Sequence, residues 1–484
     1  MLSTGPGPHD GSVPLCVDMD GTLIRTDVVW ESIVLLLKRR PHCLLALPFW
    51  LMRGRAHLKR QVAERVELDP ATLPYHRELL EFLRTEQHQG RKLILVTASD
   101  DAPARQVAAH VGLFSEVMGS NGTLNLRGAD KGRVLAERFG KRGFDYAGNS
   151  SVDLPVWAEA RHALVVNADD RLPDRARKVA EVSRVFHPHP PVLAAAFKAL
   201  RPHQWIKNLI IFVPLVTSHQ LFDVPKLSSA ILAFVAFSLC ASGVYVLNDL
   251  LDLESDRQHG SKQYRALASG QLPLSAGLLM VPGALVLSAI TACFLPWSFG
   301  AVLAVYFLLT TSYSFSLKQI ALLDVFVLAA LYTIRLIAGH ESTGVAYSFW
   351  LLAFSMFIFL SLALLKRFTE LATLRQQNRS GSRGRGYVAG DLELVAMLGI
   401  ASGFLSVLVM ALYVNSDDVK ILYRFPIMLL LVCPLLLFWI SRCWLLAHRG
   451  RMHDDPIVFA LRDGTSYLIG ALTLLVLWLA TGHH

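Results

Sequence analysis

The sequence has few of the features that mark a secreted or thiolate-based metalloprotein. Its six cysteines form no CxxC pair or other metal-binding spacing, and several lie in apolar segments, so we interpret all six as reduced packing residues. Residues 1–14 are rich in glycine and proline and lack the apolar core of a secretory signal, so we expect a disordered lead-in there. Only 18% of the residues are charged, against 53% hydrophobic. This composition excludes a single soluble domain.

The apolar residues are unevenly distributed along the chain. Residues 1–200 have the composition of a globular protein, whereas residues 207–482 contain one long apolar segment after another. A net charge of +9 is also found in nucleic-acid-binding proteins, but here the basic residues cluster in short loops between apolar segments. We therefore expect a membrane as partner and no nucleic acid.

Nine apolar segments predict an all-α membrane domain of nine transmembrane helices. They cover residues 207–222, 227–247, 275–294, 297–313, 320–338, 348–365, 393–414, 425–447 and 466–482. Pro214 and His219 interrupt the first segment.

The charges of the connecting loops predict how this domain is oriented. With a cytoplasmic N-terminal domain, thirteen loop lysines and arginines lie on the cytoplasmic side and only three on the other. The thirteen are Arg257, Lys262, Arg265, Lys318, Lys366, Arg367, Arg375, Arg379, Arg383, Arg385, Arg449, Arg451 and Arg462. The chain is thus predicted to be a multi-pass protein of a bacterial inner membrane, with residues 248–256 on the cytoplasmic side.

Polar residues follow two apolar strands predicted in the N-terminal part. The first strand ends at Asp18 and Asp20, and the second ends at Thr97. Because ligands bind at the carboxyl ends of strands in α/β folds, Asp18 is suited to be a nucleophile and Asp20 an acid/base, and the Thr97 hydroxyl is suited to hold a phosphoryl oxygen. Further along, Lys131 adds a cation and Asp153 adds a carboxylate for Mg²⁺.

In this order the segments resemble the four motifs of the haloacid dehalogenase-like (HAD) phosphatase superfamily, most clearly in the sequence DMDGT. The resemblance covers residues 13–186. It implies an α/β HAD-like (Rossmannoid) fold, an aspartyl-phosphate on Asp18, proton donation by Asp20, and phosphate binding by Thr97 and Lys131. It also implies Mg²⁺ at Asp18, Asp20 and Asp153. Asn149 departs from the usual Asp of the fourth motif, which leaves an active phosphatase and a degenerate binding domain both open.

The domain borders follow from composition. We expect the HAD-like domain at 15–186, with a helical cap at about 27–88, then a linker and interfacial helix at 187–206, and the membrane domain at 207–484. The cap combines short apolar segments with basic residues such as Lys38 and Arg39. Two environments fit it equally, namely the surface of an anionic bilayer and the phosphatase core.

A cluster of carboxylates follows the second apolar segment of the membrane domain. At helical spacing Asp249, Asp252 and Asp256 share one face, and no matching set of basic residues lies among them. Oxygen-only ligands suit Mg²⁺, and the basic residues that follow, above all Lys262 and Arg265, suit a diphosphate. The sequence therefore predicts a magnesium–diphosphate site; the alternative is an ordinary solvated loop.

The same stretch, NDxxDxxxD from Asn248 onward, resembles the first motif of the UbiA superfamily of intramembrane prenyltransferases, and the resemblance covers residues 193–482. Asn248, Asp249, Asp252 and Asp256 match the catalytic motif. Most members that use a prenyl diphosphate carry a second acidic DxxxD after the sixth span. Here that place has the sequence KRFTEL at 366–371, with one carboxylate.

The KRxxEL sequence, together with Lys207 and Asn208, resembles the decaprenyl-phosphate phosphoribosyltransferase branch of that superfamily. The resemblance implies phosphoribosyl diphosphate as donor and a polyprenyl phosphate as acceptor. The lipid phosphate would lie at Lys366 and Arg367, and Glu370 would orient the ribose or support Lys366. A fused phosphatase would then remove the 5-phosphate to give polyprenyl-phosphoribose for cell-wall arabinan or a related glycan. The alternatives are an aromatic, quinone-pathway prenyltransferase and a non-catalytic membrane anchor for the phosphatase domain.

Overall fold

The computed structural model describes residues 13–481 except 121–125, 168–170, 187–190, 378–384, 453–455 and 461. The chain divides into two compact units. The first unit comprises Met1–Arg201 together with Tyr245–Pro282, and the second comprises Pro202–Val244 together with Gly283–His484. The first unit therefore contains both the HAD-like part and the residues around the predicted aspartate motif.

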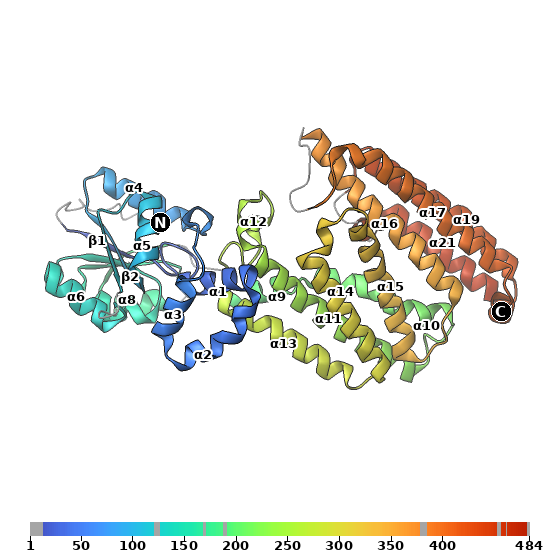
Figure 1. Ribbon diagram of the computed structural model, residues 1–484, viewed down its shortest axis with the longest axis horizontal. Helices are drawn as coiled ribbons and strands as arrows, with labels where there is room; N and C mark the ends of the chain where they lie inside the picture. Colours follow the sequence, from blue (N-terminus) through green and yellow to red (C-terminus); the bar gives the residue numbers. More distant parts are fainter. Residues whose placement is uncertain are drawn as a thin grey trace. The chain divides into compact units, whose positions relative to one another are not determined.

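A six-stranded parallel sheet with the strand order β3-β2-β1-β4-β5-β6 forms the centre of the HAD-like part (Figure 1). The strands are β1 (Leu15–Asp18), β2 (Leu93–Asp100), β3 (Glu116–Ser120), β4 (Asp145–Gly148), β5 (His162–Val165) and β6 (Glu181–Val185). Leu15 and Val17 of β1 pack into one apolar core and Cys16 packs into another, so both faces of the central strand are covered. The predicted α/β fold is confirmed.

Helices alternate with these strands as expected for a parallel sheet. Those of the HAD-like part outside the predicted cap range are α5 (Asp101–Val111), α6 (Ala129–Phe139), η3 (Ser151–Asp153), α7 (Leu154–Glu159) and α8 (Leu172–Arg177). After the sheet, α9 (Val192–Ala199) occupies the region where a short interfacial helix is predicted.

Six helical elements lie in the predicted cap range. They are α1 (Val28–Arg39), η1 (Pro41–Ala46), α2 (Leu47–Met52), α3 (Arg55–Ala63), η2 (Pro70–Thr72) and α4 (Arg77–His88). Leu79 and Leu83 of α4 pack into a sheet core, while α1 and α3 share a separate apolar cluster. In contrast, α2 has no buried residue and exposes Phe49 and Met52. Contact between α2 and lipid remains a prediction.

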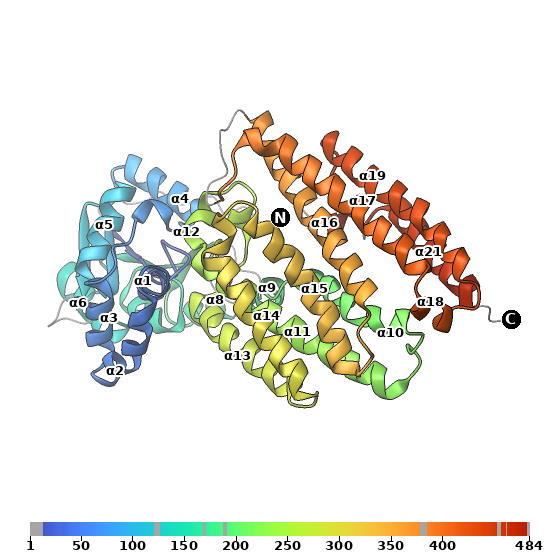
Figure 2. The same ribbon diagram turned by 45° about the vertical axis from the view of Figure 1, so that its right-hand side comes forward.

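Within the described residues, eight helices are long and apolar enough to cross a membrane (Figure 2). These spans are α11 (Val224–Leu251), α13 (Leu274–Ala292), α14 (Trp297–Phe315), α15 (Leu323–Thr343), α16 (Phe349–Gln376), Ala389–Val414 with α17 (Leu392–Val414), Pro426–His448 with α19 (Val432–His448), and α21 (Gly464–Thr481). The shorter elements among them are α12 (Leu253–Gln258), η5 (Lys262–Tyr264), η6 (Leu317–Gln319), η7 (Ala389–Asp391), α18 (Asp417–Leu422), η8 (Pro426–Leu431) and α20 (Pro456–Ala460).

The predicted count of nine spans is not confirmed. The first predicted segment, 207–222, falls in the 3₁₀ helix η4 (Pro202–Phe212) and the short helix α10 (Val213–Thr217). Pro214 lies near the start of α10, and His219 adopts a positive φ, so one long α-helix does not form here. The other eight predicted segments each have a helical counterpart.

Small residues allow the spans of the second unit to pack closely. Helices α16 and α17 lie side by side in both views (Figures 1 and 2). A Cβ atom on Gly399 would lie 2.2 Å from the ring of Trp444, and one on Gly403 would lie 2.8 Å from Ile440. Glycines at this four-residue spacing bring α17 against α19.

Candidate active sites

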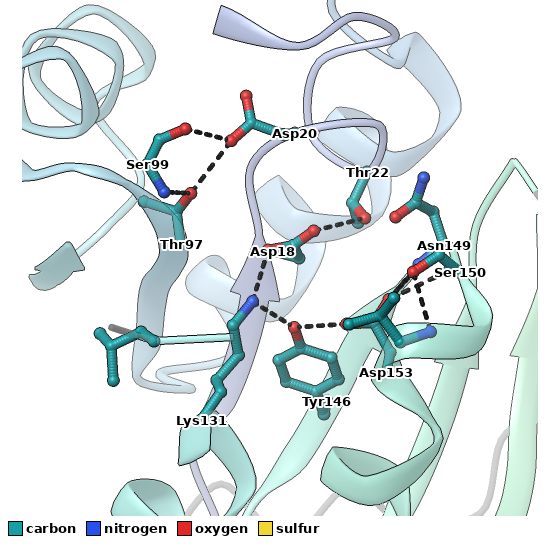
Figure 3. A network of polar contacts seen from close by, with 12 residues as sticks. Asp18, Asp20, Thr22, Thr97, Ser99, Lys131, Tyr146, Asn149, Ser150 and Asp153 are labelled. Carbon is teal, nitrogen blue, oxygen red and sulfur yellow. Dashed lines mark hydrogen bonds and ion pairs between the residues drawn. The ribbon is translucent and has the colours of Figure 1, made fainter. Parts of the chain in front are cut away.

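The first candidate site lies at the carboxyl end of β1. Asp18 is the last residue of this strand and is buried. Its Oδ1 atom accepts a hydrogen bond of 2.7 Å from the Lys131 ammonium, which in turn lies 2.9 Å from the Tyr146 hydroxyl (Figure 3). The Thr22 hydroxyl lies 3.4 Å from Asp18 Oδ2. The structure thus brings together Asp18 and Lys131, two residues singled out from the sequence.

Asp20 is held by hydroxyl groups and by the first residue of α1. Its Oδ2 atom accepts hydrogen bonds from Ser99 (2.7 Å) and Thr97 (3.2 Å), and its Oδ1 atom accepts one from the backbone N–H of Val28 (2.9 Å). Thr97 was named from the sequence, whereas the shorter bond comes from Ser99, two residues later on the same strand. Residues two apart on a strand lie on the same face, so the position of Ser99 relative to Thr97 could have indicated that both hydroxyls reach the site.

Burial shifts the protonation of both aspartates. It raises the pKa of Asp20 to about 6, and the nearby Asp27 carboxylate adds to the shift. Burial likewise raises the pKa of Asp18 to about 7, with the Lys131 ammonium acting in the opposite direction. A carboxyl group with a pKa near neutral can both hold and release a proton, which fits the predicted acid/base role of Asp20.

Asp153, a predicted Mg²⁺ ligand, holds together the loop of residues 149–153, which corresponds to the fourth motif. Its Oδ2 atom accepts hydrogen bonds from the backbone N–H groups of Asn149 (3.1 Å) and Ser150 (3.0 Å) and from the Ser150 hydroxyl (3.2 Å). Its Oδ1 atom lies 3.2 Å from the Tyr146 hydroxyl. Tyr146 therefore links Lys131 to Asp153, a role that its place in an apolar strand did not indicate. The metal role of Asp153 remains a prediction.

The side chain of Asn149 lies directly against the DMDGT turn. Gly21 has a φ of +76°, and a Cβ atom there would lie 2.1 Å from Asn149 Nδ2. Only glycine leaves room for this amide. Among the described residues no three His, Cys, Asp or Glu side chains are grouped so that they could hold a metal ion. Mg²⁺ commonly needs only one or two carboxylates when substrate phosphates and waters complete its shell, so the buried carboxylate of Asp18 fits this ion.

The second candidate site lies at the end of α11 in the same unit. Asp249 and Asp256 are buried, and the Arg265 guanidinium joins them, at 3.1 Å from Asp249 Oδ1 and 2.6 Å from Asp256 Oδ2. Arg201 also donates a hydrogen bond to Asp249. The expectation of carboxylates without matching basic residues therefore does not describe this structure, because two arginines neutralise them. The sequence around Arg201, Leu200-Arg201-Pro202, resembles the phosphoribosyltransferase branch, but its contact with Asp249, 48 positions later, was not predicted.

The remaining motif residues surround this pair. Asp252 precedes α12, and its backbone N–H bonds the carbonyl of Asn248 at 2.9 Å. Burial raises the pKa of Asp256, the Asp252 carboxylate adds to this, and Arg265 and Lys262 oppose it. The carboxylates offer only oxygen atoms, which suits Mg²⁺, and exchange of the arginines from carboxylate to diphosphate would free those atoms. The catalytic and metal roles remain predictions.

The KRxxEL residues lie on α16 in the second unit. Arg367 is only 1% exposed and lies 2.6 Å from Asp324, which is fully buried. Arg367 also pairs with Glu370, and the Tyr387 hydroxyl donates to Asp324 at 2.6 Å. Arg367 thus faces acidic partners in this structure. Its predicted contact with a lipid phosphate, and that of its neighbour Lys366, remain untested.

Lys207 and Asn208, the other predicted substrate ligands, lie on η4 and are buried. Asn208 Oδ1 accepts a hydrogen bond of 2.7 Å from Arg335 of α15, and Asn208 Nδ2 donates one of 2.9 Å to Ser238 of α11. The Arg335 guanidinium also lies 3.1 Å from the Tyr306 hydroxyl. Asn208 therefore belongs to a buried polar network that joins four elements of the membrane domain, namely η4, α11, α14 and α15.

Comparison with known proteins agrees with this two-part architecture. Residues 15–157 match the haloacid dehalogenase-like hydrolase family, and residues 209–462, just over half of the chain, match the UbiA prenyltransferase family. The fold and the two sites define a multi-pass membrane enzyme with an N-terminal HAD-like domain. The chain belongs to the UbiA prenyltransferase family.

Three curated relatives share sequence with the chain over different shares of its length. It is 40% identical to the uncharacterized protein y4nM of Sinorhizobium fredii, over 96% of this chain and 90% of that protein. It is 36% identical to the nodulation protein NoeC of Azorhizobium caulinodans, over 56% of this chain and 87% of that protein. It is also 37% identical to the decaprenyl-phosphate phosphoribosyltransferase of Mycobacterium tuberculosis, over 39% of this chain and 63% of that protein.

Two solved structures align with different parts of the chain. A UbiA homolog from Archaeoglobus fulgidus bound to DMAPP and Mg²⁺ has 15% sequence identity and a TM-score of 0.44, covering 58% of this chain and 99% of that chain. A phosphoserine phosphatase in apo form has 13% identity and a TM-score of 0.27, covering 36% of this chain and 93% of that chain.

Proposed function

We propose that the membrane domain transfers 5-phosphoribose from phosphoribosyl diphosphate to a polyprenyl phosphate. The observation that carries this proposal is the pairing of Arg367 with Asp324 and Glu370. A prenyl diphosphate donor calls for a second acidic metal site, but the carboxylates in the KRxxEL region, Asp324 and Glu370, are neutralised by Arg367, which is only 1% exposed. A sugar diphosphate donor needs only the first aspartate motif. Relatives named decaprenyl-phosphate phosphoribosyltransferase support the same kind of reaction.

In the proposed transfer, an oxygen of the lipid phosphate forms a bond to the anomeric carbon of ribose while the bond from that carbon to diphosphate breaks. The attacking oxygen is already anionic, so no strong base is needed. Bound Mg²⁺, held by Asp249, Asp252 and Asp256, would supply charge neutralisation to the leaving group. Arg265 and Lys262 stabilise the same negative charge from the protein side as it develops.

We further propose that the HAD-like domain removes the 5-phosphate from the lipid-linked product. Asp18 attacks phosphorus, Asp20 donates a proton to the departing ribose oxygen, and water then releases phosphate from Asp18. Lys131, 2.7 Å from Asp18, is placed to neutralise the phosphoryl oxygens. Tethering both sites on one chain raises the effective concentration of the intermediate at the phosphatase. The product, polyprenyl-phosphoribose, would serve a glycan of the cell envelope such as arabinan.

The test uses purified full-length protein in nanodiscs with Mg²⁺, a polyprenyl phosphate and phosphoribosyl diphosphate labelled in the ribose. Label should enter the lipid phase as polyprenyl-phosphoribose. With Asp18→Asn it should accumulate as the 5-phosphate, because the nucleophile is lost but the transferase is intact. Fully dephosphorylated product from Asp18→Asn would refute the phosphatase role. Transfer from a prenyl diphosphate to an aromatic acid, without labelled lipid, would establish the aromatic prenyltransferase instead.

A further inference from the structure

A buried ion pair joins the phosphatase cap to the aspartate loop, here defined as residues 252–270. Arg257 in the loop donates two hydrogen bonds to Glu31 of cap helix α1, one of 3.1 Å from Nη1 and one of 2.6 Å from Nη2. The two side chains are only 7% and 6% exposed. This two-pronged geometry fixes the guanidinium plane as well as its position.

The remaining donors of Arg257 tie the loop to itself and to a second part of the cap. Its Nε atom donates to the carbonyl of Ala268 at 3.0 Å, which closes the aspartate loop from one end to the other. Its Nη1 atom also lies 3.3 Å from the carbonyl of Thr72 in η2. One side chain therefore connects α1, η2 and both ends of the loop.

Apolar and backbone packing supports the same contact. Val34 of α1 belongs to one buried cluster with Leu250, Leu253 and Leu267 around the loop. Gly270 has a φ of +74°, and a Cβ atom there would lie 2.5 Å from the backbone oxygen of Arg25. Glycine is needed here for both its conformation and the close approach of the two backbones.

We propose that Glu31 of the phosphatase cap is a positioning residue for the transferase. Arg257 directly follows Asp256, and the loop that it closes carries Arg265, which bridges Asp249 and Asp256. Glu31 holds Arg257, and Arg257 sets the distance between the two ends of the loop. The cap thereby holds the carboxylates and Arg265 in the arrangement that receives metal and diphosphate. This inference rests on the proposed function for its activity readout alone.

Removal of one partner of a buried ion pair leaves the other charged and unpaired, so the loop must rearrange to solvate it. We therefore expect Glu31→Gln and Arg257→Gln each to lower the kcat/KM of phosphoribosyl transfer at least tenfold and to raise the Mg²⁺ concentration at half-maximal rate. Arg257→Lys keeps the positive charge but cannot form the two parallel hydrogen bonds to Glu31, so its kcat/KM should lie between those of these variants and the wild type. The exchanged pair, Glu31→Arg with Arg257→Glu, should recover part of the lost activity.

A matched control comes from the same interface. Lys38 of α1 pairs with Glu254 of the loop at 3.0 Å, but the two side chains are 38% and 31% exposed. Lys38→Gln should leave transfer within about twofold of wild type, since an exposed pair contributes little. Phosphatase activity towards a soluble phosphate ester should stay within about twofold in every variant, because Asp20 is held by the Val28 backbone N–H rather than by Glu31.

Hydrogen exchange of the aspartate loop in the full-length protein provides a readout that is independent of activity. Glu31→Gln should accelerate exchange across residues 252–270, while Lys38→Gln should not. Folded Glu31→Gln protein with unchanged transfer and unchanged exchange would overturn the proposal. If Glu31→Gln does not fold, Arg257→Lys with wild-type transfer and exchange would overturn it equally. If wild-type protein forms no phosphoribosyl lipid, the proposed function fails, and the exchange result alone decides whether Glu31 positions the loop.

Discussion

The aspartate loop and the KRxxEL region both pair carboxylates with arginines, yet they differ in how accessible the arginines are. The side chain of Arg265 in the aspartate loop is 29% exposed, and that of Arg201, which also binds Asp249, is 23% exposed. In the KRxxEL region Arg367 is 1% exposed, and its partner Asp324 is fully buried. Arginines that reach solvent can move to an incoming diphosphate and release carboxylate oxygens for a metal. A fully buried pair cannot separate in this way without leaving a buried charge unpaired, which costs a large amount of free energy. Similar residue types therefore predict an exchangeable metal site in one place and a permanent structural one in the other.

The largest expected effect separates the two regions by metal dependence. Asp249→Asn should lower the rate of phosphoribosyl transfer about a thousandfold, because the loss of several kcal/mol of metal-mediated stabilisation corresponds to a factor of this size. Initial rates at saturating lipid measure it. Mg²⁺ should raise the thermal unfolding midpoint of wild type and have no such effect on Asp249→Asn. If Mg²⁺ still raises the unfolding midpoint of Asp249→Asn, the metal binds elsewhere, and the aspartate loop would not differ from the KRxxEL region as a metal site.

The second effect concerns stability instead of chemistry. Arg367→Gln leaves Asp324 and Glu370 without their partner, and such a loss in a buried pair costs about 3–5 kcal/mol. Thermal unfolding in detergent should show a clear decrease, which the double variant Arg367→Gln with Asp324→Asn partly reverses. If Arg367→Gln is as stable as wild type but binds polyprenyl phosphate weakly, then Arg367 is a substrate ligand after all.

The smallest effect tests whether the accessible arginines exchange. Arg201→Gln removes a competitor of Mg²⁺ for Asp249 and also a candidate cation for the diphosphate. We expect the Mg²⁺ concentration at half-maximal rate to fall and the KM for the sugar diphosphate to rise, each a few-fold, as befits a partly exposed pair worth about 1 kcal/mol. Opposite shifts in the two constants would show that Arg201 moves from Asp249 to the diphosphate, whereas parallel shifts would indicate that Arg201 only stabilises the loop.

The sequence predicted those features that depend on local patterns. The parallel α/β domain, the strand-end position of Asp18 and the apolar helices follow from hydrophobic periodicity and from short motifs that keep their spacing. The resemblance to the phosphatase superfamily assigned Lys131 and Asp18 to one phosphate site, and the structure brings the two side chains together although 113 positions separate them.

The features that the sequence did not predict are contacts between distant residues without a shared motif. Glu31 and Arg257 are 226 positions apart, and each alone resembles an ordinary surface charge. The pairing of Asp324 with Arg367 was not predicted either, because their proximity depends on how α15 and α16 pack. Tyr146 lies in an apolar strand, and only the fold shows that its hydroxyl bridges Lys131 and Asp153. A linear pattern identifies charged residues but not which of them become partners.

The irregular segment η4–α10 has a consequence for how the protein enters its membrane. Arg201 ends one part of the first compact unit and Tyr245 begins its other part, so the chain leaves this unit and returns to it along α11. Helix α11 is long enough to cross a membrane, whereas residues 202–217 form a 3₁₀ helix followed by one short α-helix. Because this segment is not a regular apolar helix, we expect it to insert as a hairpin with α11 during biosynthesis.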